Sequence, residues 1–283
     1  MDINTGAVKD IIELALREDI GSGDITSESV IPEGTKAIAR IISKSEGIVA
    51  GIDLANEVLR KIGPSSEFKK IVLDGDRITE KQELAIINGY ARSLLTAERT
   101  MLNFLQRLSG IATQAEKYVQ AVSVFKAKVI DTRKTTPGWR VLEKYAVRVG
   151  GAGNHRFGLY DAVLIKDNHI AAVGGSIKKA VENARRRIPH TMKIEVETKT
   201  LEQIKEALEA GADIIMPDNM GPQMITRAVE IIDGKALVEA SGGITIDNIE
   251  KIAATGVDYI SIGALTHSAM PLDISMDMEL VNG

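Results

Sequence analysis

The sequence predicts an α/β protein in which an N-terminal α+β domain is followed by an incomplete parallel α/β barrel. From residue 128 onward, short apolar segments alternate with helical segments, which is the pattern of βαβ units built on a parallel sheet. Before residue 128, helices and strands occur without that alternation. A complete eightfold barrel needs about 250 residues, so the shorter alternating segment is expected to form a barrel of about six strands.

The N-terminal domain is expected to span residues 1–110. Its apolar periodicities predict, in order, a helix at 6–18, strands at 36–43 and 47–51, a helix at 53–62, a strand beginning at 67 and a helical region at 90–124. Gly110 is expected to divide the last region into two helices, because glycine weakens helix interiors. The tail 270–283 is expected to pack back on this domain.

The barrel is expected to span residues 111–269. Its strands are predicted near 128–131, 161–166, 192–197, 213–217, 236–240 and 258–262. Its helices are predicted near 138–149, 176–187, 200–210, 221–233 and 246–254.

The composition excludes several classes of protein. The formal net charge of −4 gives no electrostatic reason to expect nucleic acid or a membrane surface as a partner. The absence of cysteine excludes disulfides, thiolate metal sites and cysteine nucleophiles. The N-terminus does not resemble a signal peptide, and no apolar run approaches the ~20 residues of a membrane span. A cytoplasmic enzyme is therefore expected.

Most of the predicted strands end at polar or glycine residues, and one group of these is cationic. The group comprises Arg133, Lys134, His155, Arg156 and Lys166. In parallel barrels the carboxyl ends of the strands converge on one active-site face, which favours a binding site over scattered surface charge. Arginine forks suit carboxylate or phosphate groups. Lys166 alone would also fit a Schiff-base lysine.

Acidic residues follow on the next strands. Glu195 and Glu197 have the same parity, so they face the same side of their strand, and Asp218 ends the following one. Acids on adjacent strands suit a Mg²⁺ ion shared with substrate oxygens. Ion pairing with barrel lysines such as Lys166 is the structural alternative.

Glycine-rich turns follow the last two strands. Ser241-Gly242-Gly243 and Gly263 lie where barrel enzymes commonly bind a terminal phosphate. In the N-terminal domain, Arg99, Asn103 and Arg107 repeat every four residues and form a polar helix face, which fits an ordinary solvated surface as well.

Together these residues resemble quinolinate phosphoribosyltransferase over essentially the whole chain. The most specific segments are 131–138 (DTRKTTPG), 143–147 (EKYAV), 154–156 (NHR), 164–169 (LIKDNH), 195–197 (EVE) and 241–244 (SGGI). Two departures are mild: Trp139 stands where leucine is usual, and Pro217 precedes Asp218 where leucine is common.

The resemblance implies that quinolinate and phosphoribosyl pyrophosphate are converted to nicotinate mononucleotide, pyrophosphate and CO₂ with Mg²⁺, as a step of NAD biosynthesis. It implies that quinolinate is held by Arg133, His155, Arg156 and Lys166, and by Arg99 from the neighbouring subunit of a homodimer or a dimer-based hexamer. It places Lys134 and Lys166 beside the pyrophosphate, Glu195 and Asp218 at the metal and ribose, and Ser241, Gly242, Gly243 and Gly263 at the 5-phosphate. The expected catalytic residues are Lys134, Lys166, Glu195 and Asp218.

Three alternatives remain open from the sequence. The chain could be a related phosphoribosyltransferase for another small aromatic acid, a Schiff-base barrel enzyme, or a catalytically inactive pyridine-carboxylate sensor. A sensor would need the carboxylate-binding residues but not the acidic ones.

Overall fold

The computed structural model describes Ile3 and residues 5–281, and the chain forms two compact units. The first unit comprises Met1–Glu116, Thr135–Gly151 and Leu265–Gly283, and the second comprises Lys117–Lys134 and Ala152–Ala264. The first unit therefore includes 111–116, 135–151 and 265–269, which were predicted to lie in the barrel. No helix in the described part of the chain combines the length and apolar character needed to cross a membrane.

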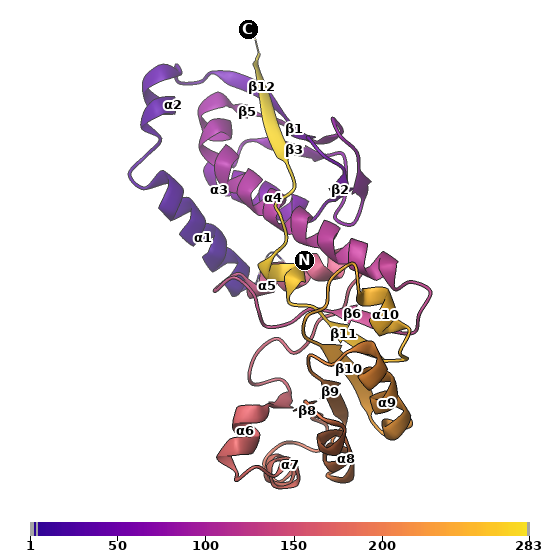
Figure 1. Cartoon of the computed structure of the whole chain (residues 1–283). Helices are drawn as coiled ribbons and strands as arrows, with labels where there is room; N and C mark the ends of the chain where they lie inside the picture. Colours follow the sequence, from indigo (N-terminus) through magenta and orange to yellow (C-terminus); the bar gives the residue numbers. More distant parts are fainter. Residues whose placement is uncertain (1–2, 4, 282–283) are drawn as a thin grey trace. The chain divides into compact units, whose positions relative to one another are not determined.

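The first unit is built on a four-stranded antiparallel sheet in the order β12-β1-β5-β3 (Figure 1). Its strands are β1 (Lys36–Ser43), β3 (Glu67–Lys70), β5 (Glu83–Tyr90) and β12 (Ile274–Leu280). The predicted strand 36–43 is confirmed, because alternate residues Ala37, Ala39 and Ile41 are buried. A separate pair is formed by β2 (Gly47–Ile48) and β4 (Arg77–Ile78).

The helices of the first unit supply the rest of its core. They are α1 (Gly6–Ile20), α2 (Ile25–Val30), α3 (Ile52–Ile62), α4 (Ala91–Ala121, whose last residues belong to the second unit), α5 (Arg140–Val149) and α11 (Ala264–His267). The prediction that Gly110 divides the long helix is wrong, because α4 is continuous. A Cβ atom at Gly110 would lie 2.0 Å from the carbonyl oxygen of Met270, so this glycine permits close approach of another segment.

The second unit contains a six-stranded parallel sheet in the order β6-β11-β10-β9-β8-β7. Its strands are β6 (Lys128–Ile130), β7 (Val163–Ile165), β8 (Ile194–Thr198), β9 (Ile214–Pro217), β10 (Leu237–Ser241) and β11 (Tyr259–Ser261). Its helices are α6 (Asp167–Ala172), α7 (Ile177–Arg185), α8 (Leu201–Glu209), α9 (Pro222–Ile232) and α10 (Ile249–Ala253). Since β6 and β7 are edge strands, the predicted incomplete barrel is confirmed.

Candidate active site

The site is built at the carboxyl ends of the second unit's strands. Because these strands are parallel, their ends share one edge of the sheet. The segments after β9 and β10 are joined there by a bridge between Asp218 and Ser241, and the N–H of Asn219 donates to the Ser241 carbonyl at 2.9 Å. The predicted ligands of the barrel thus come from neighbouring strand ends.

Asp131, directly after β6, positions the segment that carries His155 and Arg156. Its side chain is fully buried. The carboxylate accepts a hydrogen bond from the His155 N–H at 2.8 Å and another from Asn154 Nδ2 at 2.7 Å. A buried carboxylate with two donors is well satisfied, so this turn is fixed against β6.

Arg156 is the cation best prepared for an anion. Its Nη1 donates to the Ala162 carbonyl at 2.9 Å, whereas its buried Nε has no hydrogen-bond partner. Burial, followed by the charge of Arg133, lowers the pKa of Arg156, while Glu195 and Asp161 act in the opposite direction. An unpaired buried donor is costly, so an anionic ligand would stabilise this arrangement.

His155 lies between two buried glutamates. Its Nε2 is 3.0 Å from Glu195 Oε2 and 3.6 Å from Glu239 Oε1. Its Nδ1 accepts the Arg156 N–H at 2.7 Å. Burial, followed by the negative charge of Glu195, raises the pKa of Glu239, which favours its neutral form. Both ring nitrogens of His155 thus have protein partners, and a direct contact with quinolinate would require replacing one of them.

Lys166 and Glu197 form an ion pair at the ends of β7 and β8. The distance from Lys166 Nζ to Glu197 Oε2 is 2.6 Å. This confirms the structural alternative for Glu197, namely that it is the partner of a barrel lysine. Nearby, Lys199 pairs with Asp167 at 2.7 Å, and this hydrogen bond lowers the pKa of Asp167.

Glu195 and Asp218, the predicted metal ligands, lie at different depths. Glu195 is opposite Ile214 in the β8–β9 register, so Asp218 is four positions further along β9. At about 3.3 Å per residue, that offset is about 13 Å along the strand. The register therefore does not place the two carboxylates side by side. Asp218 is half-buried and accepts from Asn219 Nδ2 at 2.7 Å.

The glycine turn after β10 has the backbone geometry of an anion-binding loop. Gly242 has φ of 86° and Gly243 has φ of 62°, and a Cβ at Gly242 would lie 2.4 Å from Asn219 Oδ1. The N–H groups of both glycines donate to no acceptor in the described chain. Open N–H groups in such turns suit phosphate. Gly263 follows β11 on the same sheet edge.

Arg99, the remaining predicted ligand, lies on α4 in the first unit and is exposed. Its helix neighbour Arg107 is instead a structural residue, since its side chain is 22% exposed and Nη2 donates to Glu143 Oε1 at 2.7 Å. The polar helix face of the sequence analysis therefore combines an exposed cation with a structural one.

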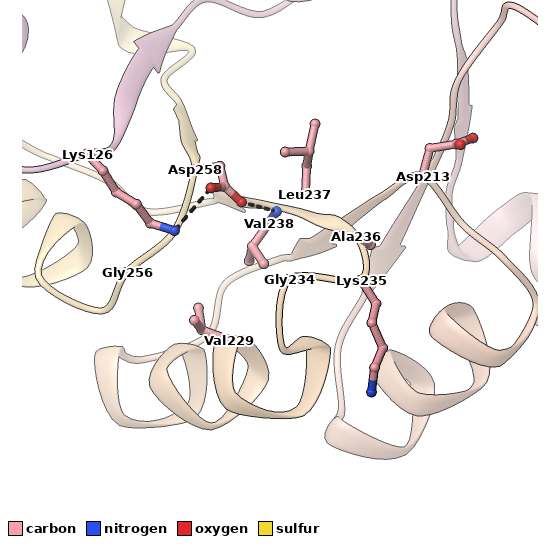
Figure 2. A pocket seen from close by; sticks show the side chains of 10 residues that line it. All are labelled: Lys126, Asp213, Val229, Gly234, Lys235, Ala236, Leu237, Val238, Gly256 and Asp258. Carbon is pink, nitrogen blue, oxygen red and sulfur yellow. Dashed lines mark hydrogen bonds and ion pairs between the residues drawn. The ribbon is translucent and has the colours of Figure 1, made fainter.

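A hollow in the second unit lies at the opposite ends of the strands. Figure 2 shows it lined by residues at the starts of β9, β10 and β11, including Asp213, Leu237 and Asp258. Its charges are already paired, because Lys126 contacts Asp258 at 3.1 Å and Asp258 also accepts the Val238 N–H. It therefore offers no set of groups comparable to the strand-end site.

Comparison with known proteins decides the family. The family model described as quinolinate phosphoribosyl transferase, C-terminal domain, matches residues 111–277, and the one for its N-terminal domain matches residues 24–109. The chain belongs to the quinolinate phosphoribosyl transferase family. A probable nicotinate-nucleotide pyrophosphorylase [carboxylating] of Bacillus subtilis is 46% identical, over 97% of this chain and 94% of the relative. The chloroplastic nicotinate-nucleotide pyrophosphorylase [carboxylating] of Oryza sativa is 42% identical, over 96% of this chain and 78% of the relative.

Solved structures agree with this membership. NadC from Streptococcus pyogenes superposes with a TM-score of 0.95 at 42% identity and covers 100% of both chains. The nicotinate-nucleotide pyrophosphorylase of Pyrococcus furiosus, at 18% identity and a TM-score of 0.74, shares the fold. The quinolinate phosphoribosyl transferase fold is thus present over the whole chain, and the resemblance drawn from the sequence motifs is confirmed.

Glu239 belongs to the site but was not predicted from the sequence. The available signal was an acid inside the apolar segment ALVEAS, because a charged residue within a barrel strand is rarely buried without a partner. Asp131 was noted only as part of a motif, although its carboxylate holds the segment that carries His155 and Arg156.

Proposed function

We propose that this chain transfers the phosphoribosyl group of phosphoribosyl pyrophosphate to the ring nitrogen of quinolinate and releases pyrophosphate and CO₂, forming nicotinate mononucleotide for NAD biosynthesis. The observation that carries the proposal is the buried, unpartnered Nε of Arg156, within electrostatic reach of the Arg133 charge. Quinolinate supplies two adjacent carboxylates, and guanidinium groups bind carboxylates through charge-assisted hydrogen bonds.

The proposed quinolinate ligands are Arg133, Arg156 and Lys166. His155 is not assigned as a quinolinate ligand, because its Nε2 already faces Glu195 Oε2 at 3.0 Å. Arg99 reaches the site of a neighbouring subunit, so the working form is a homodimer or a dimer-based hexamer in the cytoplasm. This assignment rests on the family resemblance and on the exposure of Arg99 on α4.

The proposed phosphoribosyl pyrophosphate site uses the remaining strand ends. The open N–H groups of Gly242 and Gly243 bind the 5-phosphate, together with Ser241 and Gly263. Lys134 and Lys166 lie beside the pyrophosphate. Glu195 and Asp218 face the ribose.

Mg²⁺ fits one part of this donor set. It prefers oxygen ligands and commonly combines one or two carboxylates with substrate phosphates, which suits the half-buried Asp218. Glu195 is about 13 Å deeper along the strand direction and already accepts from His155, so we assign only Asp218 to the ion. When bound, the ion supplies positive charge to the departing pyrophosphate.

During the reaction, charged side chains of this protein stabilise the charges that develop on the ribose and on the departing pyrophosphate. Cleavage of the bond to pyrophosphate leaves positive charge on the ribose, which the carboxylates of Glu195 and Asp218 stabilise. Lys134 and Lys166 stabilise the negative leaving group. Once ribosylated, the pyridinium nitrogen stabilises the carbanion formed as the adjacent carboxylate leaves as CO₂, and that carbon then takes up a proton.

The ion pair of Lys166 disfavours the Schiff-base alternative. Imine formation needs an amine free to attack a carbonyl carbon, whereas Lys166 Nζ donates to Glu197 Oε2 at 2.6 Å. A related phosphoribosyltransferase for another small acid remains the second candidate, and substrate comparison separates the two.

The test is direct turnover. Purified protein is incubated with quinolinate, phosphoribosyl pyrophosphate and Mg²⁺, and nicotinate mononucleotide is followed by chromatography while ¹⁴CO₂ is collected from carboxyl-labelled quinolinate. We expect equal amounts of both products, and no product when Mg²⁺ is omitted. Folded protein that binds both substrates without turnover would instead indicate a sensor.

A further inference from the structure

The cluster of His155, Glu195 and Glu239 is the most heavily buried group of titratable side chains at the site. The three side chains are 11%, 5% and 3% exposed, and one ligand atom from each lies within 4.8 Å of the others. They come from the segment after β6, from β8 and from β10. A cluster of one histidine and two carboxylates has the composition of a metal site, so the ring hydrogen bonds must decide its chemistry.

The ring of His155 is oriented by the backbone that follows it. Its Nδ1 accepts the Arg156 N–H at 2.7 Å, and a ring nitrogen that accepts a hydrogen bond carries no proton. The ring proton is therefore on Nε2, the atom that faces Glu195 Oε2 at 3.0 Å. A metal-binding histidine normally donates its second nitrogen to an acceptor, which is the reverse of this arrangement. The cluster is thus organised by the hydrogen bond from His155 Nε2 to Glu195 Oε2 and not by a metal ion.

Glu195 is left with one oxygen available. Its Oε2 faces His155, whereas its Oε1 is buried and has no hydrogen-bond partner. A buried carboxylate oxygen without a partner is costly, so it is suited to a donor that arrives with the substrate. The orientation of that oxygen depends on the ring that holds the other one.

We propose that His155 and Glu239 are positioning residues for Glu195: His155, with its proton on Nε2, holds Glu195 Oε2, and Glu239 confines the ring from β10, so that Glu195 Oε1 faces the substrate. Glu239 Oε1 lies 3.6 Å from Nε2, and its side chain, which is 3% exposed, is also hydrogen-bonded to Glu195, so Glu239 limits the movement of both side chains. The substrate group that Glu195 Oε1 recognises is a hydroxyl or another neutral hydrogen-bond donor, because a carboxylate oxygen only accepts hydrogen bonds.

The first test needs no activity. Long-range ¹H–¹⁵N NMR of the histidine rings, with His155 assigned by its loss in His155→Gln, reports which ring nitrogen is protonated. We expect the Nε2–H tautomer of His155 in the wild-type protein. In Glu239→Leu, where the ring is less confined, we expect exchange between the Nε2–H and Nδ1–H tautomers. A stable Nδ1–H form, or one equivalent of transition metal that copurifies and is lost in His155→Leu, would overturn the proposal.

The second test uses the enzyme and rests on the proposed function. Glu239→Leu and His155→Leu are expected to lower kcat by roughly 10–100-fold with little change in the quinolinate KM, because displaced catalytic groups cost rate. Glu239→Gln and His155→Gln keep polar groups of similar length and are expected to restore most of the rate. The double variant Glu239→Leu with His155→Leu should lose no more than either alone, since both act through Glu195.

A matched control separates positioning from general damage to the barrel. Thr198, also buried, has opposite parity to Glu195 on β8 and donates to the Met216 carbonyl at 3.3 Å, so Thr198→Val should lower stability without changing kcat. Additive losses in the double variant, or equal losses in the leucine and glutamine variants, contradict positioning. If the wild-type protein has no activity, the proposed function fails while the NMR result still decides this inference.

Discussion

Replacing Arg156 by alanine tests the carboxylate site most sharply. The variant removes the buried Nε that has no protein partner and the Nη1 contact with Ala162. One charge-assisted hydrogen bond to quinolinate is worth about 1.5–3 kcal/mol. At 1.4 kcal/mol per factor of ten, quinolinate affinity is expected to fall by roughly 10–150-fold.

The assay is titration calorimetry with each substrate separately. Phosphoribosyl pyrophosphate affinity should be retained, because its phosphate is assigned to Gly242 and Gly243 at another strand end. Arg156→Lys keeps the charge but not the planar fork, so an intermediate loss is expected. Arg186→Ala is the control, because Arg186 is exposed at the carboxyl end of α7, and this variant should keep its quinolinate affinity. Unchanged quinolinate affinity in a folded Arg156→Ala protein would refute the assignment.

Three further outcomes are expected. Nicotinate should be used poorly beside quinolinate, because it lacks the second carboxylate that would pair with the buried Nε of Arg156, and comparable kcat/KM values would contradict this. Mixed subunits carrying Arg99→Ala and Lys166→Ala, each inactive alone, should regain about a quarter of wild-type activity after random exchange, since one site per mixed dimer is intact. Confirmed exchange without recovery would place Arg99 in its own chain's site or outside catalysis. Gly110→Ala should destabilise by about 1–3 kcal/mol, because the new methyl meets the Met270 carbonyl, and an unchanged melting temperature would refute this contact.

The sequence predicted the fold where one periodicity dominates. The alternating residues of β1 and the six apolar strand segments were sufficient to predict these strands, because burial of one or both faces leaves a clear pattern. It failed at Gly110, since helix propensity is local while the approach of Met270 is a contact 160 residues away in the chain. It also missed α6, a short helix that follows Lys166 directly.

The strand-end location of the candidate site was predictable from the sequence, whereas the pairing of its side chains was not. Strand-end positions identified Arg133, Arg156 and Lys166, because all parallel strands end at one edge. The offset between Glu195 and Asp218 depends on the β8–β9 register, and the shared role of His155 and Glu239 depends on two ring hydrogen bonds. Neither register nor ring orientation is encoded in residue spacing.

The pairing of β1 with β12 has a consequence for how the chain is made on the ribosome. Roughly 230 residues separate the two strands, so at about 5–20 residues per second β1 waits on the order of 10–50 s for its neighbour. During that interval β1 can pair with β5 on one side, while its other edge presents unpaired backbone groups. The first unit therefore becomes complete only after the second has been synthesised, and a nascent chain that stops before β12 exposes an edge open to pairing with other chains.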